Sequence, residues 1–473
     1  MKPNLSPLEE EQRSGTKEYD FFDRRLDGMI NMGHELVILS DKVDWDFLYE
    51  SFVDVYCSDN GRPGVNIRLM TGLLILKSIH KLSDEDVVER WVENPYYQYF
   101  CGEVYFKHKF PISPTSLTHF RQRVGEDRLN KILDETLMVA FKVKAIKVDD
   151  LKKVIVDTTV QEKNVIFPSY PRLLYKAICE LSKMSKKYNI KLRQTYLRVG
   201  KSALVKYFRY RHAKQFRRAR KQEKFLKLRL ARIIRDIKRN KPEELVNNPE
   251  IKEHLSKATE IFISDKIKSS KGKLLSWDKP EVECIGKGKI DKPYEFGCKA
   301  SITTTLNPSK AGHLVLHSKA LHNNPYDGHT LKEVIKELEN RTGITTKRIF
   351  VDKGYVGHNL ENKIKVYRSG QKRGVNKQIK QEIKRRSAVE PIIGHLKNDH
   401  HLDRNYLKGQ EGDKINAVMA AIGYNFARLL KYIKENSNKI LLALLKFRIL
   451  LTKIRKIIEI LIPENQKLKI NFG

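Results

Sequence analysis

Two segments predicted as buried strands each end on an aspartate, Asp157 in "VIVDTTV" and Asp352 in "IFVDKGY". A carboxylate at the end of a buried strand is costly unless it is paired or binds a metal, although a single such aspartate is often a turn or cap residue. Two aspartates on adjacent strands, with a carboxylate from a following helix, could converge at one edge of a sheet. They would offer the oxygen ligands that Mg²⁺ prefers. A pair of such ions could activate a water or a 3′-hydroxyl and stabilise the leaving oxygen in phosphodiester cleavage.

The candidate third carboxylate is Glu390, in the helix-patterned stretch "RRSAVEPIIGHLKNDHHLDR". Arg386 lies four residues before it and Lys397 seven after it, so the three are expected on one helical face. Taken alone, this triplet is typical of an exposed, salt-bridged helix. However, Glu390 follows Asp352 by 38 residues, enough for one more strand and a helix. We therefore expect Arg386 and Lys397 to hold this helix against DNA or to orient Glu390.

The composition indicates a folded, strongly basic protein. The 473 residues suffice for roughly two or three domains with proper cores. They include 92 Lys and Arg against 57 Asp and Glu, a formal charge of +35, with 40% hydrophobic residues. Such a charge makes nucleic acid the leading partner, through neutralisation of phosphates. An anionic membrane surface or a ribosome would attract the same charge.

Other ligand classes receive little support from the sequence. The five cysteines form no C-x-x-C pair, which favours a reducing compartment and predicts no zinc site. The stretch "IGKGK", with Gly286 and Gly288, lacks the length and the final Lys-Ser/Thr of a P-loop, so no nucleotide cofactor is expected. Residues 437–473 are predicted as a basic amphipathic tail, because their longest apolar run, Ile440 to Leu445, is far short of the roughly 20 residues that span a bilayer. No secretory segment is predicted at the start of the chain.

Residues 1–145 are predicted to be helical. Ser83 is a candidate N-cap, followed by acidic residues in the first turn, and Pro114 opens a helix that carries Arg121 and Arg123. Short helices with a cationic last helix suit a DNA-binding domain of the helix-turn-helix type, with Arg121 and Arg123 as groove or phosphate contacts. Small helical bundles share this pattern, and the region could instead dimerise the protein.

Residues 146–436 are predicted to form a mixed sheet with covering helices, interrupted by a helical insertion at 170–275. Between Lys206 and Lys241 the insertion holds 16 Lys or Arg but two acids. An apolar stripe indicates a packed helix whose outer face contacts phosphate, although a solvated face remains the alternative. The residues chosen as DNA contacts on this face are Arg217, Arg218, Arg220 and Lys221.

The remaining strands and helices follow from local patterns. "YEFGCKASITTTL" and "GHLVLHSKAL" are predicted as a hairpin, and "KRIFVDKGY" and "KIKVYRSG" as further strands. Helices are expected over "DGHTLKEVIKELENRTG", closed by Gly343, and over 376–398 and 411–436. Asp327 and His329 could assist the carboxylate site or only form a turn and helix cap. The histidines near Glu390 are interpreted as surface residues rather than zinc ligands; they are His395, His400 and His401.

From about residue 50 to 435 the chain resembles the DDE transposases of bacterial insertion sequences, most closely those of the IS-five type. Four stretches carry the resemblance. The first begins at "FVDVYCSDNG" and ends at "YQYFCG", and the second is "VDTTVQEKNVIFPSY". The third comprises "NPYDGHTL" and "FVDKGYVGHN", and the fourth is "RRSAVEPIIGHLKNDHHLDRNYLKG". The last stretch is similar to the family's Y-x2-R-x3-E-x6-K pattern at Arg386, Glu390 and Lys397, with Ile383 at the Tyr position.

The resemblance implies an α/β, RNase H-like catalytic domain in which Asp157, Asp352 and Glu390 bind two Mg²⁺ ions, with Mn²⁺ as a substitute. It also implies binding to the terminal inverted repeats of an element, hydrolysis at the 3′ ends, and strand transfer into target DNA. The expected setting is the bacterial cytoplasm at the nucleoid, with a homo-oligomer on double-stranded DNA. Two alternatives stay open, namely a catalytically silent DNA-binding protein and an RNase H-like nuclease without strand transfer.

Overall fold

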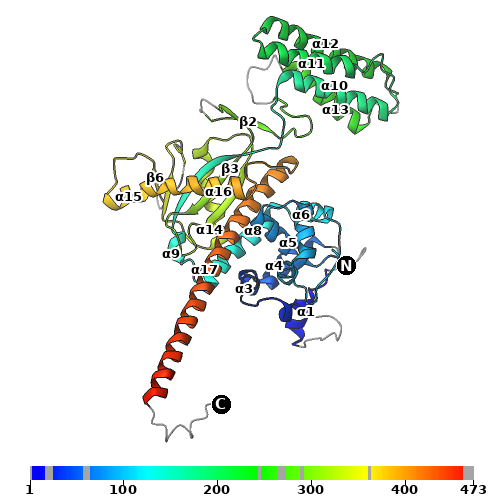
Figure 1. Ribbon diagram of the computed structural model, residues 1–473. Coiled ribbons are helices and arrows are strands. Elements are labelled where there is room, and N and C mark those ends of the chain that lie inside the picture. The colour runs from blue at the N-terminus through cyan, green and yellow to red at the C-terminus, as the bar shows by residue number, and fades with distance from the viewer. Residues whose placement is uncertain are drawn as a thin grey trace.

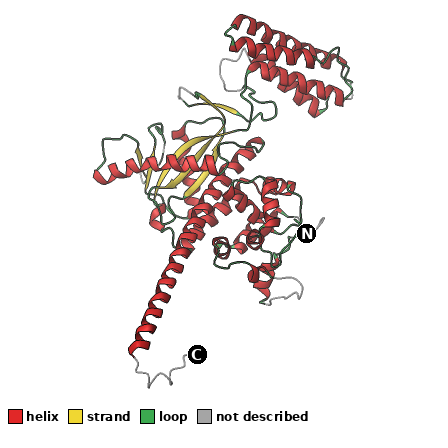
Figure 2. Ribbon diagram, in the orientation of Figure 1, coloured by secondary structure: helices red, strands yellow, loops and turns green. Residues whose placement is uncertain are grey.

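The computed structural model describes residues 3–15, 25–56, 64–242, 245, 247–264, 273–287, 292–358, 360 and 364–461, with residues 440–461 described by their backbone alone. Three groups of elements are visible: a helical amino-terminal region, a mixed sheet with covering helices, and a separate helical bundle (Figure 1). Colouring by secondary structure shows that the strands are gathered in the sheet between the two helical groups (Figure 2). The α/β class predicted from the sequence is confirmed.

The amino-terminal region is helical, as predicted. Ser83 caps α6, and its side chain and that of Asp86 form a reciprocal capping box. Helix α8 begins at Thr115 and bends at Gly125, whose φ of 68° lies outside the helical region. The helices of this region are α1 (Pro7–Ser14), α2 (Leu26–Met29), α3 (Glu35–Lys42), α4 (Trp45–Phe52), η1 (Val53–Val55), α5 (Ile67–His80), α6 (Asp84–Glu93), α7 (Pro95–Phe100), α8 (Thr115–Lys142) and α9 (Val148–Leu151).

The sheet has the order β2-β3-β1-β5-β6, and β4 pairs with β3 beside this path. Strand β1 is antiparallel to β3 and parallel to β5, and β5 is parallel to β6, which makes the sheet mixed. The predicted hairpin is present as β3 and β4, and β2 is an additional strand that the sequence did not indicate. The strands are β1 (Lys153–Glu162), β2 (Glu283–Gly286), β3 (Tyr294–Thr305), β4 (Val315–Leu321), β5 (Arg348–Val351) and β6 (Lys365–Arg368).

Side chains of the central strands alternate between two apolar cores, because successive residues of a strand point to opposite faces. Val154 and Val156 belong to a large core that includes α14 (Asp327–Thr342) and the amino-terminal helices. Ile155 and Phe350 belong to a smaller core on the other face, with Ile379 of α15 (Lys377–Arg385) and Val389 of α16 (Val389–Asp399). The face that carries Ile155 and Phe350 is therefore the one covered by α15 and α16.

The single helix predicted over 376–398 is broken. α15 ends at Arg385, and the 3₁₀ turn η4 (Arg386–Ala388) joins it to α16. Pro391 supplies the physical reason, because it lacks the N–H that would bond the carbonyl four residues earlier and its ring clashes with that carbonyl. Proline is tolerated in the first turn of a new helix, so a restart at Val389 removes the conflict.

The insertion follows β1, as predicted, and forms a bundle of α10 (Tyr170–Lys187), α11 (Leu197–His212), α12 (Phe216–Asn240) and α13 (Pro249–Ile263). The bundle has its own apolar core, to which α12 contributes the predicted stripe of Leu226, Leu230, Ile233 and Ile237. In Figure 1 the bundle lies apart from the amino-terminal helices and is joined to the sheet by the segments after β1 and before β2.

Helix α17 (Gly409–Leu461) unites the predicted helix 411–436 with the start of the predicted tail. Its first half runs between the sheet and the amino-terminal helices, and its second half projects from the body (Figure 1). Buried Ile415, Val418, Ile422 and Phe426 place it in the same core as α5, α8 and α14. The boundary predicted near residue 145 is thus a boundary along the chain, whereas the apolar core is continuous across it. Within the described residues, no helix is both long enough and apolar enough to cross a membrane.

Candidate functional site

The register of two parallel strands brings Asp157 and Asp352 together. Ile155 of β1 pairs with Phe350 of β5, and each aspartate lies two residues further along its own strand. Both therefore point to the face covered by α15 and α16. Asp352 directly follows β5, as predicted. The prediction that Asp157 ends its strand was wrong, because β1 continues to Glu162 through antiparallel pairing with β3.

Arg386 lies at the centre of the three predicted carboxylates. One of its guanidinium nitrogens, Nη2, donates to Asp157 Oδ2 at 2.6 Å. The other, Nη1, lies 3.7 Å from Asp352 Oδ1 and 3.6 Å from Glu390 Oε1. The side chains of Asp352 and Glu390 are 53% and 67% exposed, whereas that of Asp157 is 14% exposed. One cation thus faces three carboxylates, two of which are open to solvent.

Helix α15 is fixed to the sheet by a buried carboxylate, and this fixes Arg386. Glu382 accepts from Lys153 Nζ at 2.7 Å and from Arg348 Nη1 at 2.8 Å, and these residues open β1 and β5. Ile383, at the position where the family pattern has tyrosine, packs against the apolar core of Ile155 and Phe350. The turn that follows α15 therefore delivers Arg386, and then Glu390 in the first turn of α16, to the edge where the aspartates lie.

The electrostatic environment leaves Asp157 poorly compensated. Burial, with smaller contributions from Asp352 and Asp327, raises the pKa of Asp157 to about 6, against the lowering effects of Arg386 and the Thr158 N–H. Tyr355, buried three residues after Asp352, has its pKa raised by burial and then by Asp157 and Asp327. A carboxyl with this pKa is mostly ionised at pH 7 but poorly compensated, so a cation that binds to it would be stabilised.

Asp327 is a fourth carboxylate near the site, held by Lys299 of β3. Lys299 Nζ donates to Asp327 Oδ1 at 3.0 Å and to the Pro325 carbonyl at 2.9 Å. The start of α14 lies against the loop after β5, since a Cβ on Gly328 would lie 2.0 Å from the Val356 carbonyl oxygen. Only glycine fits there. The helix-cap interpretation of Asp327 was wrong, because Tyr326 is at the N-cap and Asp327 is the first residue of α14. Asp327 does lie close enough to Asp157 to raise its pKa.

The residues present fit a divalent cation. Three carboxylates from β1, the end of β5 and α16 surround one guanidinium, which stands where positive charge is required. Hard oxygen donors of this kind suit Mg²⁺ or Mn²⁺ rather than softer metals. Asp157, Asp352 and Glu390 would hold the ion or ions, and Arg386 would have to move aside for them to bind.

Arg121 does not lie where a DNA contact was predicted. Its guanidinium donates to both oxygens of Asp84, at 2.7 and 2.6 Å, and Lys77 Nζ donates to the same carboxylate at 2.7 Å. Burial by itself raises the pKa of Asp84, but the hydrogen bond from Arg121 and the charge of Lys77 hold it down to about 2. Arg121 is thus a buried ion-pair partner. Arg123, two residues on, is exposed and lies over the ring of Tyr56.

Lys397 also differs from its prediction. It lies in the last turn of α16, half-buried, and its pKa is lowered by burial. Its charged neighbours are Glu295 of β3 and Glu162 at the end of β1. In the described part of the chain it makes no ion pair with Asp157, Asp352 or Glu390. The helical period correctly places Arg386 and Glu390 together, but Lys397 lies one helix length away from the carboxylates.

The cationic face of α12 is exposed, as expected. Arg217, Arg218, Arg220 and Lys221 all have exposed side chains, while Ala219 between them is buried. Arg218 bonds Gln215 and lies over Tyr210. Among the described residues none of these four cations is paired with a carboxylate, so the face is available to an anion.

The histidines near Glu390 divide into two kinds. His395 is exposed and pairs with Asp399 at 2.8 Å, as a surface residue should. His400 was wrongly placed on the surface, because it is buried and its Nδ1 lies 2.9 Å from the Ser78 carbonyl oxygen. His401 is half-buried with a φ of 61°. Gly288, from the rejected nucleotide motif, and Cys57 lie outside the described residues.

Lys299 and Tyr355 are residues of the site that sequence reasoning missed. Tyr355 lies in "DKGY", three residues after Asp352, and its aromatic character after a strand end was the available signal. Nothing local marks Lys299, because its partner Asp327 lies 28 residues away and is reached only when β3 approaches the start of α14.

Comparisons with known proteins agree with this geometry. Residues 24–123 match the family described as Transposase domain (DUF772), and residues 265–426 match the Transposase DDE domain family. The second match includes Asp352 and Glu390, while Asp157 and most of the insertion lie between the two matches. No solved structure matches the chain at a significant level.

One curated relative is similar over a large share of its own length. It is a protein of Rhizobium meliloti described as "Uncharacterized protein ORF8 in nfe locus". It is 43% identical over 204 residues, which are 43% of this chain and 98% of that protein. Together with the mixed sheet and the carboxylates that it brings together, these matches show that the chain belongs to the DDE transposases, with a DUF772-type amino-terminal domain before a DDE catalytic domain.

Proposed function

We propose that this transposase serves an insertion sequence of the IS-five type, binds the terminal inverted repeats of that element, cleaves at the 3′ ends and joins them to target DNA. The observation that supports this most is the group of three carboxylates around Arg386. A site with more carboxylates than cations, open to solvent on one side, suits divalent ions and a phosphodiester.

In this proposal Asp157, Asp352 and Glu390 hold two Mg²⁺ ions. When bound, the ions supply an activated water or 3′-hydroxyl and stabilise the leaving oxygen. The chain's own residues prepare the site. Glu382 fixes α15 to the sheet, Arg386 neutralises the carboxylates until ions enter, and afterwards its guanidinium is free to bind a backbone phosphate of DNA, for which its planar fork is suited.

DNA contacts are proposed on two surfaces. The exposed cations of α12 would bind phosphates without regard to sequence, since phosphate contacts dominate affinity but carry no base information. Recognition of the element's ends is assigned to the amino-terminal helices, with Arg123 as a contact in place of the buried Arg121. Lys397 is not retained as a DNA contact in this proposal. A homo-oligomer on DNA is also part of it, because two ends must be joined.

The test compares cleavage and binding in the same preparations. Asp157→Asn, Asp352→Asn and Glu390→Gln should each abolish nicking of element-end DNA, because a missing ligand leaves the ion site incomplete, while gel-shift affinity for the same DNA stays near that of the unmodified chain. Asp399→Asn is the matched control, because this carboxylate lies on α16 but pairs with His395 outside the site. Near-normal nicking by any of the three variants would remove that residue from the site.

The same gel shifts separate the proposal from its alternatives. End DNA should bind at least about tenfold more tightly than scrambled DNA of equal length, a difference of about 1.4 kcal/mol. Equal binding of both DNAs with retained nicking would favour a nuclease without end recognition. The intact chain is used because the amino-terminal helices share their core with α17, so residues 1–145 alone would lack part of it.

A further inference from the structure

A second group of possible metal ligands lies away from the carboxylate site, where α17 packs against the sheet. Cys298 Sγ of β3, a ring nitrogen of His322 after β4 and a carboxylate oxygen of Asp413 in α17 all lie within 4.8 Å of one another. Cys298 and Asp413 are buried, and His322 is half-buried. The three residues come from separate parts of the chain, and strand pairing brings the first two together, since Lys299 pairs with Leu321.

The distances suit a tetrahedral metal. Cys298 Sγ lies 3.5 Å from His322 Nδ1. In a tetrahedral zinc site with Zn–S of about 2.3 Å and Zn–N of about 2.0 Å, the sulfur and nitrogen are themselves about 3.5 Å apart. The 4.8 Å limit for the third ligand requires a movement of no more than about 1.5 Å, within the reach of a side-chain rotation. Thiolate, imidazole and carboxylate are the ligands that Zn²⁺ accepts in proteins.

Two polar atoms beside the group have no partner. His322 Nε2 and Glu283 Oε2 are buried, and neither makes a hydrogen bond among the described residues. The Glu283 Oε1 accepts from the Asn323 N–H at 2.6 Å, but Glu283 pairs with Gly297, which precedes Cys298, so its side chain leaves β2 on the opposite face of the sheet from Cys298. With Nδ1 as the ligand, Nε2 lies on the far side of the imidazole ring from the ion, so neither of these two atoms is counted as a ligand.

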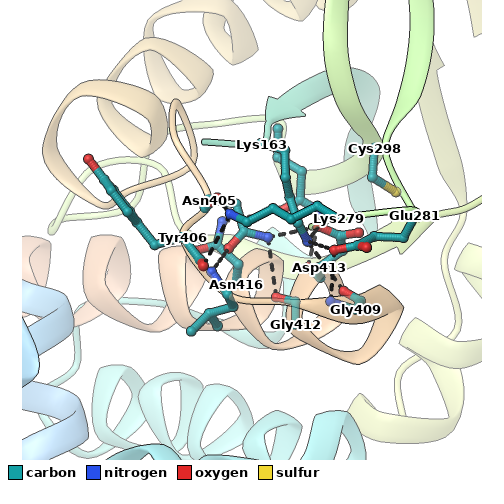
Figure 3. Close-up of polar contacts among 12 residues, drawn as sticks. Lys163, Lys279, Glu281, Cys298, Asn405, Tyr406, Gly409, Gly412, Asp413 and Asn416 are labelled. Atoms are coloured by element: carbon teal, nitrogen blue, oxygen red, sulfur yellow. Dashed lines mark hydrogen bonds and ion pairs between the residues drawn. The ribbon is translucent and has the colours of Figure 1, made fainter. Parts of the chain in front are cut away.

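Asp413 is held in position by bonds to one of its two oxygens. Lys163 Nζ donates to Asp413 Oδ1 at 2.6 Å and Asn405 Nδ2 donates to the same oxygen at 2.7 Å. Figure 3 shows this network with Cys298 close beside it. In the described part of the chain the hydrogen bonds to this carboxylate all end on Oδ1. The other oxygen is thus left for a further cation.

The charges around the group favour a divalent ion. The charged groups that act on the Cys298 thiol are the carboxylates of Asp413 and Glu283 and the ammonium group of Lys163, so with a neutral thiol its immediate surroundings carry a net negative charge. Burial raises the pKa of the Cys298 thiol, and Asp413 and Glu283 raise it further, so the thiol keeps its proton when no metal is bound. A divalent ion that displaces this proton would bring the pocket to neutrality.

We propose that Cys298, His322 and Asp413 bind one Zn²⁺. The thiol proton is released to solvent on binding, and the ion reaches the pocket past the half-buried His322 and Glu283. The ion would join β3, the turn after β4 and α17. Lys163, which pairs with Asp413, lies where the chain leaves the sheet for the insertion, and Lys279 lies where the chain returns. The ion would thus hold the cationic bundle in a fixed position relative to the carboxylate site. This departs from the sequence-based expectation of no zinc site.

The experiment uses the full chain, prepared free of metal and titrated with Co²⁺ in excess Mg²⁺. A cobalt ion with a thiolate ligand gives a near-ultraviolet charge-transfer band, which the carboxylate site cannot produce because it holds no sulfur. One equivalent of Co²⁺ should produce the band, and Zn²⁺ should abolish it by displacement. Cys298→Ser should eliminate the band, and His322→Gln should weaken Co²⁺ binding at least tenfold.

Cys179→Ser is the matched control, because Cys179 is a half-buried free thiol on α10 of the insertion and is not part of this group. It should leave the band unchanged. Circular dichroism establishes whether each variant is folded. If Cys298→Ser does not fold, His322→Gln, at a half-buried position, tests the site in its place. A folded unmodified chain without the band, or a Cys298→Ser chain that binds Zn²⁺ as tightly as the unmodified one, would overturn the proposal.

Discussion

Two arginines of this protein lie among carboxylates, and their surroundings differ in one respect that decides their roles. Arg121 is 5% exposed and forms a two-bond pair with Asp84, to which Lys77 adds a second cation. Arg386 is 13% exposed and faces Asp157, Asp352 and Glu390, with one short bond and two ion pairs beyond 3.5 Å. Cations outnumber carboxylates at the first, and carboxylates outnumber cations at the second.

The pKa values express the same difference. Burial raises the pKa of Asp84, but hydrogen bonds and neighbouring cations hold it down to about 2. The pKa of Asp157 is raised to about 6 by burial and by the neighbouring acids. A satisfied buried pair stabilises the fold, but a carboxylate in surplus destabilises it until a cation arrives. Surplus charge, rather than the presence of an arginine, therefore separates a binding site from a structural contact.

The largest effect is expected from removing the satisfied arginine. Arg121→Met should lower the free energy of unfolding by about 3–5 kcal/mol, because Asp84 is then left buried without its main partner. Arg386→Met should cost much less, since two of its three carboxylates remain open to water. Urea denaturation at pH 7 measures both, with the exposed Arg123→Met as a control expected within about 0.5 kcal/mol of the unmodified chain. Equal destabilisation by Arg121→Met and Arg386→Met would contradict the distinction between the two arginines.

The two aspartates should respond with opposite sign to the same substitution. The folded pKa of Asp157 lies above its ordinary value of 3.8, so its ionisation costs stability as the pH rises through 6. Asp157→Asn should therefore stabilise the metal-free chain at pH 7, by up to about 3 kcal/mol. The folded pKa of Asp84 lies below 3.8, so its contribution is present above pH 4 and is lost as the pH falls toward 2. Asp84→Asn should thus destabilise at pH 7, by about 2 kcal/mol.

Denaturation at pH 7 and at pH 4 measures these changes in the presence of a chelator. The stabilisation by Asp157→Asn should largely disappear at pH 4, where the native carboxyl is protonated in the folded state. If both variants changed stability in the same direction at pH 7, the assignment of surplus charge to the Asp157 site would be wrong.

Magnesium should stabilise the chain only through the site with surplus carboxylates. At a concentration of about one hundred times its dissociation constant, Mg²⁺ should raise the free energy of unfolding by about 2.7 kcal/mol. This increase should shrink as the pH falls through 6, because Asp157 then holds a proton that the ion must displace. It should be absent in Asp157→Asn and present in Arg123→Met. An equal increase in Asp157→Asn would place the magnesium elsewhere.

The smallest effect on stability, but a clear one on DNA binding, is expected from the cations of α12 that pair with no carboxylate in the described part of the chain. Replacing Arg217, Arg218, Arg220 and Lys221 by alanine should weaken binding to every DNA sequence. It should also flatten the dependence of log affinity on log salt by about 0.9 for each DNA phosphate that is no longer neutralised. Lys257→Ala is the control, because this ammonium on α13 is already paired with Glu253. An unchanged slope would return α12 to the interpretation as a solvated face.

Local patterns predicted much of the fold and the three carboxylates. The strand and helix periods, the cap at Ser83, the Gly343 terminus and the hairpin of β3 and β4 all depend on residues close in sequence. The break at Arg386 was missed although Pro391 marked it, because the apolar period continues across it. β2 was missed because its four residues form a strand only by pairing with β3.

The sequence alone establishes that the protein is basic and that strands alternate with helices. It also places two aspartates on predicted strands and a glutamate on a predicted helix. Which charges are matched depends instead on how distant segments pack. Arg121 meets a carboxylate 37 residues away and Arg386 one that is 229 residues away. Helical and strand periods describe which face a side chain occupies, but not which distant segment packs there. Burial and ion-pair partners set the energy of a charge. The same residue type therefore stabilises the fold at one place and forms part of a binding site at another.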